Sequence, residues 1–537
     1  MNEPLAIGVA SWDHPFDDEQ ALLNLSAILP AYISGRRWYR GKARTMQRLT
    51  IQDLLPADSE AFILVLRIEY EDGAHDEYVL PAIVARPGAG EPSDDLICSV
   101  RAADGSEGSL YNALSNASFR QALLDTVVRE GAFEGQHGNL VGHHTKALEA
   151  IGGPATGFES FVSRAEQSNT SIIYGARYIL KLFRKLEEGV NPDVEVGNFL
   201  TRRGFKHTPA VLGSLEYNTE NGESHPAGIL QQFVPNQGDA WSYTLRSLGG
   251  FFERARSGKV KLQTRHPIEL AAKEMPAHTR ELLGDYADSA ALLGKRTAQM
   301  HAAFEDENAG QDFIPEPFTP QDGEALYREL LSQADIAFEL LRRKQPVLTG
   351  VAAEAGREVL RLEPEVMNRF GALHESRVTA VRIRHHGDYH LGQVLYTGTD
   401  FMIIDFEGEP TRTLPERRKK ALAMRDVAGM LRSFQYAAFS ALFATGPDVP
   451  AEPGRRSAVE LAAFWTAWTG ATYVKAYFAE AGGLRCVPSE TGERRLLLDV
   501  FLLQKALYEM VYELNNRPDW VRIPLRGILS LVSEPLN

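Results

Sequence analysis

The feature that most constrains the fold is a change of hydrophobic period near residue 238. Before this point, short apolar runs rich in β-branched and aromatic residues predict strands. After it, apolar residues recur at helical spacing over long segments. Because strands and helices are segregated along the chain, the sequence predicts an α+β fold in which a strand-rich part precedes a helix-rich part.

The individual elements follow from the same periods. In the first part we expect strands at 61–68, 78–80, 158–164, 170–174, 178–183 and 227–234, and helices at 21–29 and 109–130. A further helix should begin near Asn191, with Pro192 in its first turn, where a missing N–H is tolerated. In the second part we expect helices at 240–256, 283–304, 323–343, 365–375, 417–443, 459–480 and 494–514.

At 537 residues the chain is too long for one ordinary hydrophobic core. The Pro- and Gly-rich segment 87–93 is the best linker signal in the first half. We therefore expect an N-terminal α+β cap domain over residues 1–90, an intermediate region with a strand-rich lobe over residues 91–237, and a helical lobe over residues 238–537.

Charge and composition exclude several classes of partner. A formal net charge of −14 would repel both nucleic acid and an anionic membrane. The two cysteines, Cys98 and Cys486, form no CxxC pair, so neither a disulfide framework nor a thiolate metal site is indicated. No apolar run approaches the length of a membrane span, and the N-terminus lacks the pattern of a signal peptide. We expect a cytoplasmic protein with no nucleic-acid and no membrane partner.

Two segments near residue 400 carry the clearest chemical signal. Residues 386–393 read HGDYHLGQ, and residues 402–408 read MIIDFEG. They place Asp388 in a loop, the Gln393 amide shortly after it, and Asp405 at the end of an apolar strand. A polar turn separates two predicted strands here, so a hairpin would return Asp405 toward Asp388.

These oxygen donors suit phosphoryl transfer from a nucleotide to a hydroxyl. The reaction needs a carboxylate that orients the hydroxyl and accepts its proton, and oxygen ligands for a magnesium ion that bridges the phosphates. Asp388 would be the base, while Gln393 and Asp405 would hold the metal. The alternative is a plain hairpin whose acids cap turns, because Asp beside Gly is common there. A hairpin alone does not require three such donors, which favours the catalytic interpretation.

The sequence HGDYH at 386–390, with Asp405 followed by Phe-Glu, resembles the aminoglycoside phosphotransferase and choline kinase group, relatives of the protein kinases. The resemblance implies a bilobal protein-kinase-like fold with a strand-rich N-lobe and a helical C-lobe. This chain carries Gln393 where most of the group has Asn. Gln offers the same carbonyl oxygen on a stem one methylene longer, so metal binding can survive with a shifted backbone.

The departure at Gln393 makes the chain similar to the bacterial maltokinases, which make maltose 1-phosphate from maltose and ATP. Further matches are VNPD at 190–193, FVPNQGDAW at 233–241 and YEMVYELNNRP at 508–518. The resemblance extends from about residue 36 to about residue 526. It implies an ATP:maltose 1-phosphotransferase of α-glucan metabolism, with ATP and magnesium as cofactors.

The nucleotide side is less distinctive. No GxxxxGK[ST] sequence occurs, which disfavours a P-loop. Ser168, Asn169, Thr170 and Ser171 lie between two predicted strands, where a kinase carries its phosphate-covering loop. Small hydroxyl and amide residues can present backbone N–H groups to phosphates, although the same residues are also routine in polar turns.

Lys181 lies in an otherwise apolar strand. Either its stem covers apolar surface while its head reaches water, or it holds the α- and β-phosphates as the kinase resemblance implies. Glu195, on the next helix, is then its expected ion-pair partner. By the same resemblance, Gln231 to Val234 would be the hinge that binds adenine.

Lys505, Tyr508 and Tyr512 fall on one face of a predicted helix. Such a stripe suits a sugar, because aromatic rings stack on C–H faces and ammonium or phenol groups bond hydroxyls. The alternative is a core stripe, although a buried lysine would then need a partner. The maltokinase resemblance implies acceptor binding at these positions. His386 and Glu407 are further candidates to contact the reacting hydroxyl or the metal, and His386 is alternatively a hydrogen-bonded loop histidine.

The segment 36–44 (RRWYRGKAR) is basic enough to bind phosphates. Most such clusters are solvated faces or internal ion-pair donors, which disfavours a direct catalytic role, and bracing of the cap against the lobe is the alternative. In maltokinases the corresponding segment belongs to the cap domain.

We therefore expect a kinase that phosphorylates the anomeric hydroxyl of maltose. A kinase of the same fold with another acceptor, such as glucosamine or an aminoglycoside, is the first alternative. An alternative of another class is a noncatalytic pseudokinase that serves as a partner module, for example of a trehalose-forming or glucan-building enzyme. The presence of Lys181, Asp388 and Asp405 argues against this last alternative.

Overall fold

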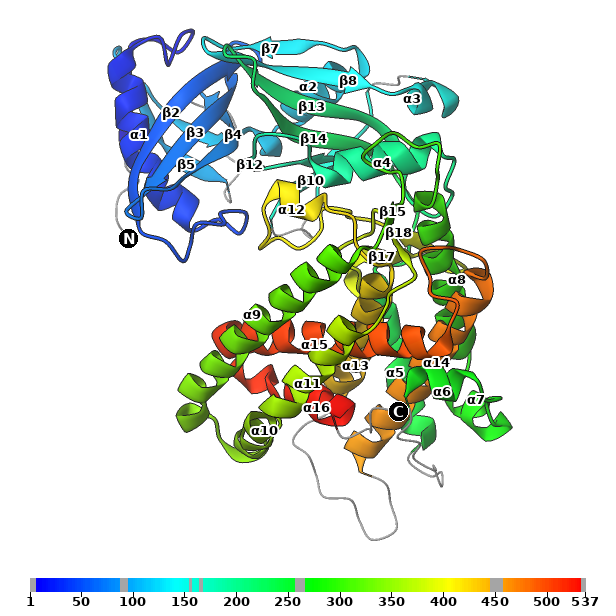
Figure 1. Cartoon of the computed structure of the whole chain (residues 1–537). Coiled ribbons are helices and arrows are strands. Elements are labelled where there is room, and N and C mark those ends of the chain that lie inside the picture. Colours follow the sequence, from blue (N-terminus) through cyan, green and yellow to red (C-terminus); the bar gives the residue numbers. More distant parts are fainter. Residues whose placement is uncertain are drawn as a thin grey trace. The chain divides into compact units, whose positions relative to one another are not determined.

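A computed structural model describes residues 6–86, 95–153, 157–163, 168–255, 266–444 and 457–532. The chain divides into a first unit, residues 1–204 with 208–235, and a second unit, residues 205–207 with 236–537. The two large sheets belong to the first unit, and the long helices from α5 onward belong to the second (Figure 1). The predicted α+β fold, strand-rich first and helix-rich second, is confirmed.

The first sheet has the strand order β1-β5-β6-β4-β3-β2, and β12 pairs with β4. Its strands are β1 (Ala6–Val9), β2 (Met46–Pro56), β3 (Ala61–Tyr70), β4 (His75–Ala85), β5 (Leu96–Ala102), β6 (Glu107–Asn112) and β12 (Lys185–Leu186). The sheet therefore takes in strands from both sides of the boundary expected near residue 90. The linker signal at 87–93 itself lies outside the described residues.

The second sheet has the order β7-β8-β13-β14-β11-β10-β9. Its strands are β7 (Ala132–Glu134), β8 (Gly138–His144), β9 (Ser160–Val162), β10 (Thr170–Tyr174), β11 (Tyr178–Leu182), β13 (Val211–Thr219) and β14 (Ser224–Gln232). The α-helices of the first unit are α1 (Glu19–Ser34), α2 (Ala117–Val128), α3 (Lys146–Ala150) and α4 (Pro192–Arg202). As predicted, α4 starts at Pro192, and Asn191 caps it.

Strand β3 shows why one segment of the first unit is continuously apolar. Leu64 and Leu66 pack in one core, together with α1. Ile63 and Val65 point the other way and pack in a second core, together with α2 and strands of the second sheet. Because both faces of β3 are covered, its sequence does not alternate between apolar and polar residues.

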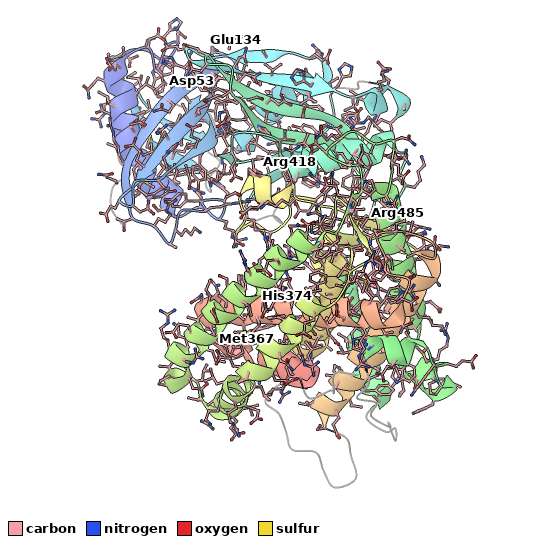
Figure 2. All side chains as sticks on the ribbon, viewed as in Figure 1. Asp53, Glu134, Met367, His374, Arg418 and Arg485 are labelled. Atoms are coloured by element: carbon pink, nitrogen blue, oxygen red, sulfur yellow. The ribbon has the colours of Figure 1, made fainter. Side chains whose placement is uncertain are left out.

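Asp53 is a buried polar link within the first unit (Figure 2). Its carboxylate accepts the Tyr217 hydroxyl of β13 at 3.0 Å and the Gln136 N–H at 2.9 Å. Only 3% of Asp53 is exposed. A buried carboxylate is tolerated when hydrogen bonds replace its hydration, so this contact fixes β2 of the first sheet against the second sheet.

The helix predicted at 109–130 starts later than expected. Residues 107–112 form β6 instead, and α2 begins only at Ala117. The Asn116 side chain accepts the Phe119 N–H at 2.9 Å, which is the capping bond that defines a helix start. The apolar residues before Asn116 fit the helical period as well as the strand period, so periodicity alone extends the predicted helix over them.

The second unit is built mainly from helices. They are α5 (Ala240–Ala255), α6 (Pro267–Ala271), α7 (Ala277–Leu283), α8 (Tyr286–Phe304), α9 (Pro320–Lys344), α10 (Gly350–Arg361), α11 (Glu363–Glu375), α12 (Leu414–Arg417), α13 (Met424–Ala444), α14 (Ala458–Glu480), α15 (Thr491–Asn516) and α16 (Arg522–Val532). Two short strand pairs accompany them, β15 (Glu316–Pro317) with β16 (Val381–Arg382) and β17 (Val394–Tyr396) with β18 (Phe401–Ile403). Within the described part of the chain, none of the helices combines the length and the apolar character needed to span a bilayer.

The helix predicted at 417–443 is two helices. The single turn α12 ends at Arg417, and α13 begins at Met424. Between them lie turns and a bend, and Ala421 forms an antiparallel bridge with Ile383. Ile383 lies just before the loop that carries Asp388, so the bridge joins the start of this loop to the segment that precedes α13.

Helices α8 and α14 approach each other closely at Gly294. A Cβ atom at this position would overlap the backbone carbonyl oxygen of Tyr473. By contrast, a Cβ atom at Gly249 on α5 would have no neighbour within 4 Å. The two glycines therefore differ in what an added methyl group would meet.

We expect Gly294→Ala to lower the free energy of unfolding by about 1–3 kcal/mol, because the methyl group overpacks the α8–α14 contact. Gly249→Ala is the matched control and should raise it by about 0.5–1 kcal/mol, since alanine favours a helix over glycine. Denaturant unfolding followed by circular dichroism measures both. A shift of the same sign in the two variants would contradict the close contact.

Candidate active site

Asp426, in the first turn of α13, anchors the loop that carries Asp388. Its buried carboxylate accepts the backbone N–H of His386 at 2.8 Å and that of Gly387 at 3.0 Å. On another side it lies 3.1 Å from Nε2 of His301. Burial would raise the pKa of Asp426, but the hydrogen bond from His301 and the neighbouring histidines hold it well below its usual range. The loop is thus fixed to an ionised carboxylate.

The His386 ring is part of the same support. Its Nδ1 accepts the Asp388 N–H at 3.4 Å, and its Nε2 lies 2.9 Å from the carbonyl oxygen of Ile404. The residue is 1% exposed and packs against Phe406. Both ring nitrogens thus face backbone groups of the two motif segments. This arrangement agrees with the alternative of a hydrogen-bonded loop histidine. It holds the loop that carries Asp388 to the strand that precedes Asp405.

The backbone allows the two motif segments to pass closely. Gly387 has φ +84° and Gly408 has φ +73°, and a Cβ atom on Gly387 would lie 3.2 Å from the Gly408 Cα. Asp405 also has a positive φ, +67°, which is uncommon for a residue with a side chain. Ile404 donates its N–H to the Gln393 carbonyl at 3.0 Å. The hairpin therefore brings Asp405 back to the segment that follows Asp388, as predicted.

Asp388 lies beside two cationic or titratable groups. Lys505 Nζ donates to Asp388 Oδ1 at 3.2 Å, and His390 Nε2 lies 3.8 Å from Oδ2. Burial would raise the pKa of Asp388, but Lys505 and His390 together lower it. For Lys505, burial opposes the charge, yet Asp388 and Glu409 raise its pKa above the usual value. Asp388 is therefore an ionised acceptor, and Lys505 is its charged partner.

The donor set near Asp405 fits magnesium by its chemistry. Asp405 and Glu407 each place a carboxylate oxygen within 4.8 Å of the other. Gln393, which carries an amide oxygen, is tied to the strand before Asp405 through the Ile404 N–H. Carboxylate and amide oxygens are the hard ligands that Mg²⁺ takes. Glu407 thus lies beside Asp405, one of the two residues predicted to bind the metal.

In the first unit, Lys181 lies in the middle of β11, opposite Ser171 of β10 and Ile229 of β14. It is 8% exposed, and its Nζ lies 3.3 Å from Asp193 Oδ2. Asp193 is in the first turn of α4 and is itself 1% exposed. Glu195, the partner expected from the sequence, lies in the same first turn of α4, and Asp193 is an ion-pair partner that the sequence did not indicate.

The four residues expected in a phosphate-covering loop divide into two kinds. Thr170 and Ser171 belong to strand β10, not to the turn. The Thr170 hydroxyl accepts from Arg184 Nε at 2.9 Å, and the Ser171 carbonyl accepts the Ser163 N–H at 2.8 Å. Strand β10 begins at Thr170, as predicted, so of these four residues only Ser168 and Asn169 precede the strand.

Of the hinge candidates, Gln231 lies inside β14, opposite Ile179, whereas Val234 follows the end of that strand.

Two arginines of the basic segment 36–44 form ion pairs within the first unit. Arg36 lies 3.7 Å from Asp95 and over the ring of Tyr32, and Arg44 lies 2.7 Å from Asp72. Such contacts agree with the bracing alternative for this segment.

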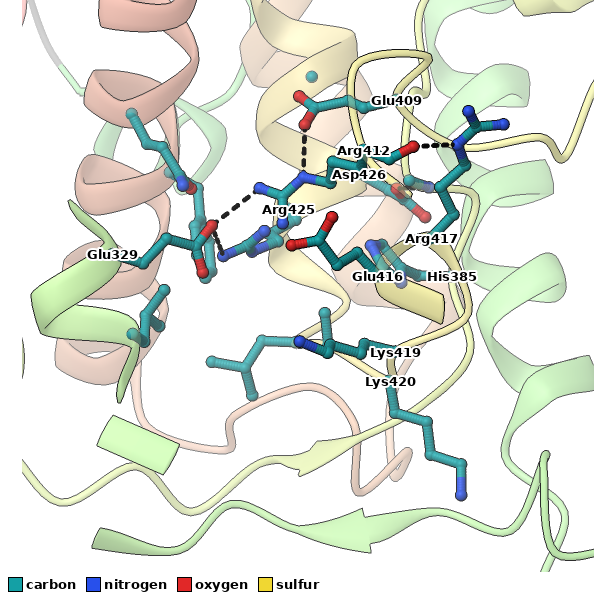
Figure 3. Close-up of a pocket in the computed structure, with 18 of the residues that line it drawn as sticks. Glu329, His385, Glu409, Arg412, Glu416, Arg417, Lys419, Lys420, Arg425 and Asp426 are labelled. Carbon is teal, nitrogen blue, oxygen red and sulfur yellow. Dashed lines mark hydrogen bonds and ion pairs between the residues drawn. The ribbon is translucent and has the colours of Figure 1, made fainter. Parts of the chain in front are cut away.

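A cavity of about 410 Å³ opens beside Asp388, entirely within the second unit (Figure 3). Lys505 and Tyr508 line it, and the Lys505 ammonium lies 4.7 Å from the Tyr508 ring centre. Tyr512 does not line it. Tyr512 is 47% exposed and packs against Arg517. Seven residues span two helical turns, about 10 Å, so Tyr512 shares a face with Lys505 but lies too far along α15.

The cavity wall carries a chain of alternating charges that sequence patterns do not indicate. Arg412 Nε lies 2.7 Å from Glu409, and its NH2 group lies 2.8 Å from Glu329 of α9. Glu329 is also 3.6 Å from Arg425, and Glu409 is 3.8 Å from Lys505 (Figure 3). The members come from distant parts of the chain, so spacing along the sequence gives no signal for them.

No family model matches the chain. A glucosamine kinase from Streptacidiphilus jiangxiensis is 25% identical over 398 residues, 73% of this chain and 77% of that protein. A glucosamine kinase from Mycolicibacterium smegmatis is 26% identical over 373 residues, 69% and 78% of the two proteins.

Two solved structures are similar over nearly the whole chain. One is a glucosamine kinase in complex with glucosamine, ADP and inorganic phosphate, with a TM-score of 0.59 and 18% identity over 91% of this chain and 94% of that one. The other is a glucosamine kinase in crystal form B, with a TM-score of 0.60 and 19% identity over 95% and 99%. These likenesses confirm the kinase-like fold. The relatives support the wider sugar-kinase group, and not the maltokinases in particular.

We expect Lys505→Met to raise the pKa of the Asp388 carboxyl, because burial remains while the largest opposing charge is removed. Selective ¹³C labelling of aspartate carboxyls, with Asp388→Asn to assign the signal, measures this pKa by NMR. Lys475→Met, which changes an exposed lysine of α14, is the control and should leave the signal unchanged. An Asp388 signal that titrates alike in the wild type, Lys505→Met and Lys475→Met would exclude Lys505 as its partner.

Proposed function

We propose that this chain is an ATP- and magnesium-dependent sugar kinase whose acceptor is maltose, phosphorylated at the anomeric hydroxyl. The observation that carries the proposal is the ionised Asp388 held by Lys505 at a cavity of sugar-compatible size. A carboxylate that is kept charged while mostly surrounded by protein is suited to accept a proton from a hydroxyl.

In this proposal Asp388 orients the acceptor hydroxyl and takes its proton as the phosphoryl group arrives. Lys181 holds the nucleotide phosphates, and Asp193 fixes the lysine in place at 3.3 Å. Ser168 and Asn169 supply the turn that covers the phosphates, while the backbone from Gln231 to Val234 takes the adenine. When bound by Gln393, Asp405 and Glu407, magnesium would neutralise charge on the phosphates.

The choice of maltose rests on the sequence resemblance to maltokinases around Gln393 and residues 508–518. Glucosamine is the second candidate, because the two curated relatives and the two solved structures are glucosamine kinases. The pseudokinase alternative, with a trehalose-forming or glucan-building partner enzyme, is disfavoured since Lys181 and Asp388 both keep their charged partners.

The test is a phosphorus NMR assay of the full chain with magnesium, ATP and either maltose or glucosamine. A phosphate on the anomeric carbon couples to one proton, whereas a 6-phosphate couples to two, so one spectrum identifies both the acceptor and the position. Formation of a sugar 1-phosphate from maltose supports the proposal. Transfer to glucosamine alone replaces the acceptor, and no transfer with no magnesium-dependent nucleotide binding supports the pseudokinase.

We expect Asp388→Asn to lower kcat by about 10²–10⁴-fold, because the amide cannot accept the hydroxyl proton. ATP affinity should stay within about threefold, since no nucleotide contact is assigned to Asp388. Steady-state kinetics and nucleotide titration measure the two effects. Asp335→Asn, an exposed aspartate on α9, is the control and should behave as wild type. Turnover at the wild-type rate by Asp388→Asn would remove this residue as the base.

A further inference from the structure

The cavity beside Asp388 is lined by many charged side chains, and its carboxylates already have partners. Glu329 has Arg412 and Arg425, and Glu409 has Arg412 and Lys505. These pairs lie next to one another on the wall, as the dashed lines in Figure 3 show for Glu329 and Glu409. Each of these two acids of the wall is thus paired with two cations of the protein.

The remaining acids of the wall follow the same rule. Asp322 lies 2.7 Å from Arg382, and Asp426 accepts two backbone N–H groups. Glu416 accepts the N–H and hydroxyl of Thr413 as the cap of α12, at 2.9 Å each. Among the described residues of the lining, every carboxylate is therefore engaged by a donor of the protein itself.

The cations of the wall extend further than this pairing requires. Lys419 and Arg417 also line the cavity; Lys419 is exposed, and Arg417 donates to the backbone carbonyls of Arg412 and Pro410. A positively charged ligand would meet these groups in addition to Arg412 and Arg425. An uncharged hydroxyl, which both donates and accepts, can bridge a guanidinium and its carboxylate without disturbing their charge balance.

We infer that this cavity selects an uncharged polyhydroxy sugar over an aminosugar cation, and that Arg412 is the residue that sets the preference. The inference rests on the proposed function for the identity of the site, and it names the acceptor class. Arg412 qualifies because it contacts both Glu329 and Glu409 and lies between α9 and the segment that follows Asp405. Removing its charge would leave those two acids with one cation each, which would favour an ammonium ligand.

Binding is the primary readout, because it stands whether or not transfer occurs. Glucose and glucosamine form a matched pair that differs at one position, a hydroxyl against an ammonium near pH 7, and maltose is the proposed acceptor. Isothermal titration of the full chain with magnesium and ADP should show maltose and glucose binding more tightly than glucosamine. In Arg412→Gln we expect the glucose-to-glucosamine affinity ratio to shift toward glucosamine by about tenfold or more.

Two further variants separate the charge of Arg412 from other effects of a substitution. Arg412→Lys retains the charge and should retain the preference, even where overall affinity falls. Arg328→Gln removes an arginine of the same helix as Glu329 whose partner, Glu324, lies outside the cavity lining. It is the matched control and should leave the ratio within about twofold of wild type.

A second measurement uses the unmodified chain, so its result does not depend on whether the variants fold. Raising the pH through the pKa of the glucosamine amine removes its charge, while Arg412, Arg425 and Lys505 stay protonated. Glucosamine binding should therefore strengthen as pH rises, and glucose binding should change little. Tighter binding of glucosamine than of glucose near pH 7, or an unchanged ratio in a folded Arg412→Gln protein, would overturn the inference. Selective sugar binding without any phosphoryl transfer would instead overturn the proposed function and leave the inference standing.

Discussion

The second unit depends on a single buried carboxylate. Asp426 receives two backbone N–H groups of the loop at Asp388 and faces His301. An unpaired charge at such depth would cost several kcal/mol, so the residue is stable only while the loop holds its present course. The dependence is mutual, because the His386 N–H is buried and the Gly387 N–H is partly buried, so both need this acceptor. Asp388 is placed by this exchange rather than by its own contacts.

Around Asp388 the protein balances desolvation with charge. Burial alone would favour a protonated carboxyl there, and burial alone would favour a neutral Lys505. Each group reverses the tendency of the other, since they lie 3.2 Å apart. The same alternation continues through Glu409 and Arg412 to Glu329 on α9. Opposite charges placed in sequence keep a partly buried surface polar at a tolerable cost, which is what a cavity for hydroxyl groups requires.

Local patterns were sufficient for much of the fold. The apolar run of β3, the cap and proline at the start of α4, and the periods of the long helices were readable because each depends on neighbours along the chain. The predictions were wrong where two periods overlapped. Residues before Asn116 fit a helix and a strand equally, and the extended bridge at Ala421 interrupts a helical pattern that continues on both sides.

The candidate site also has parts that the sequence predicts and parts that it does not. The hairpin that returns Asp405 was predictable, since the turn and both strands are local. Asp426 was not singled out, although an acid at the start of an otherwise apolar helix is a signal that could have found it. Asp193 lies beside Lys181 and was not singled out, because side-chain direction in the first helical turn cannot be read from spacing alone. Tyr512 fell outside the cavity since a shared helical face does not bring residues two turns apart into one site.

The acceptor wall is the least predictable part for a physical reason. Glu329, Arg412 and Lys505 come from α9, the segment before α12, and α15, so their meeting depends on the packing of three elements. Each residue alone is an ordinary charged side chain on a helix or loop, and only their pairing gives the wall its chemistry. Under the proposed function, acceptor binding would therefore depend on the packing of these elements, whereas the positions of Asp388 and Asp405 depend on the anchored loop and the hairpin.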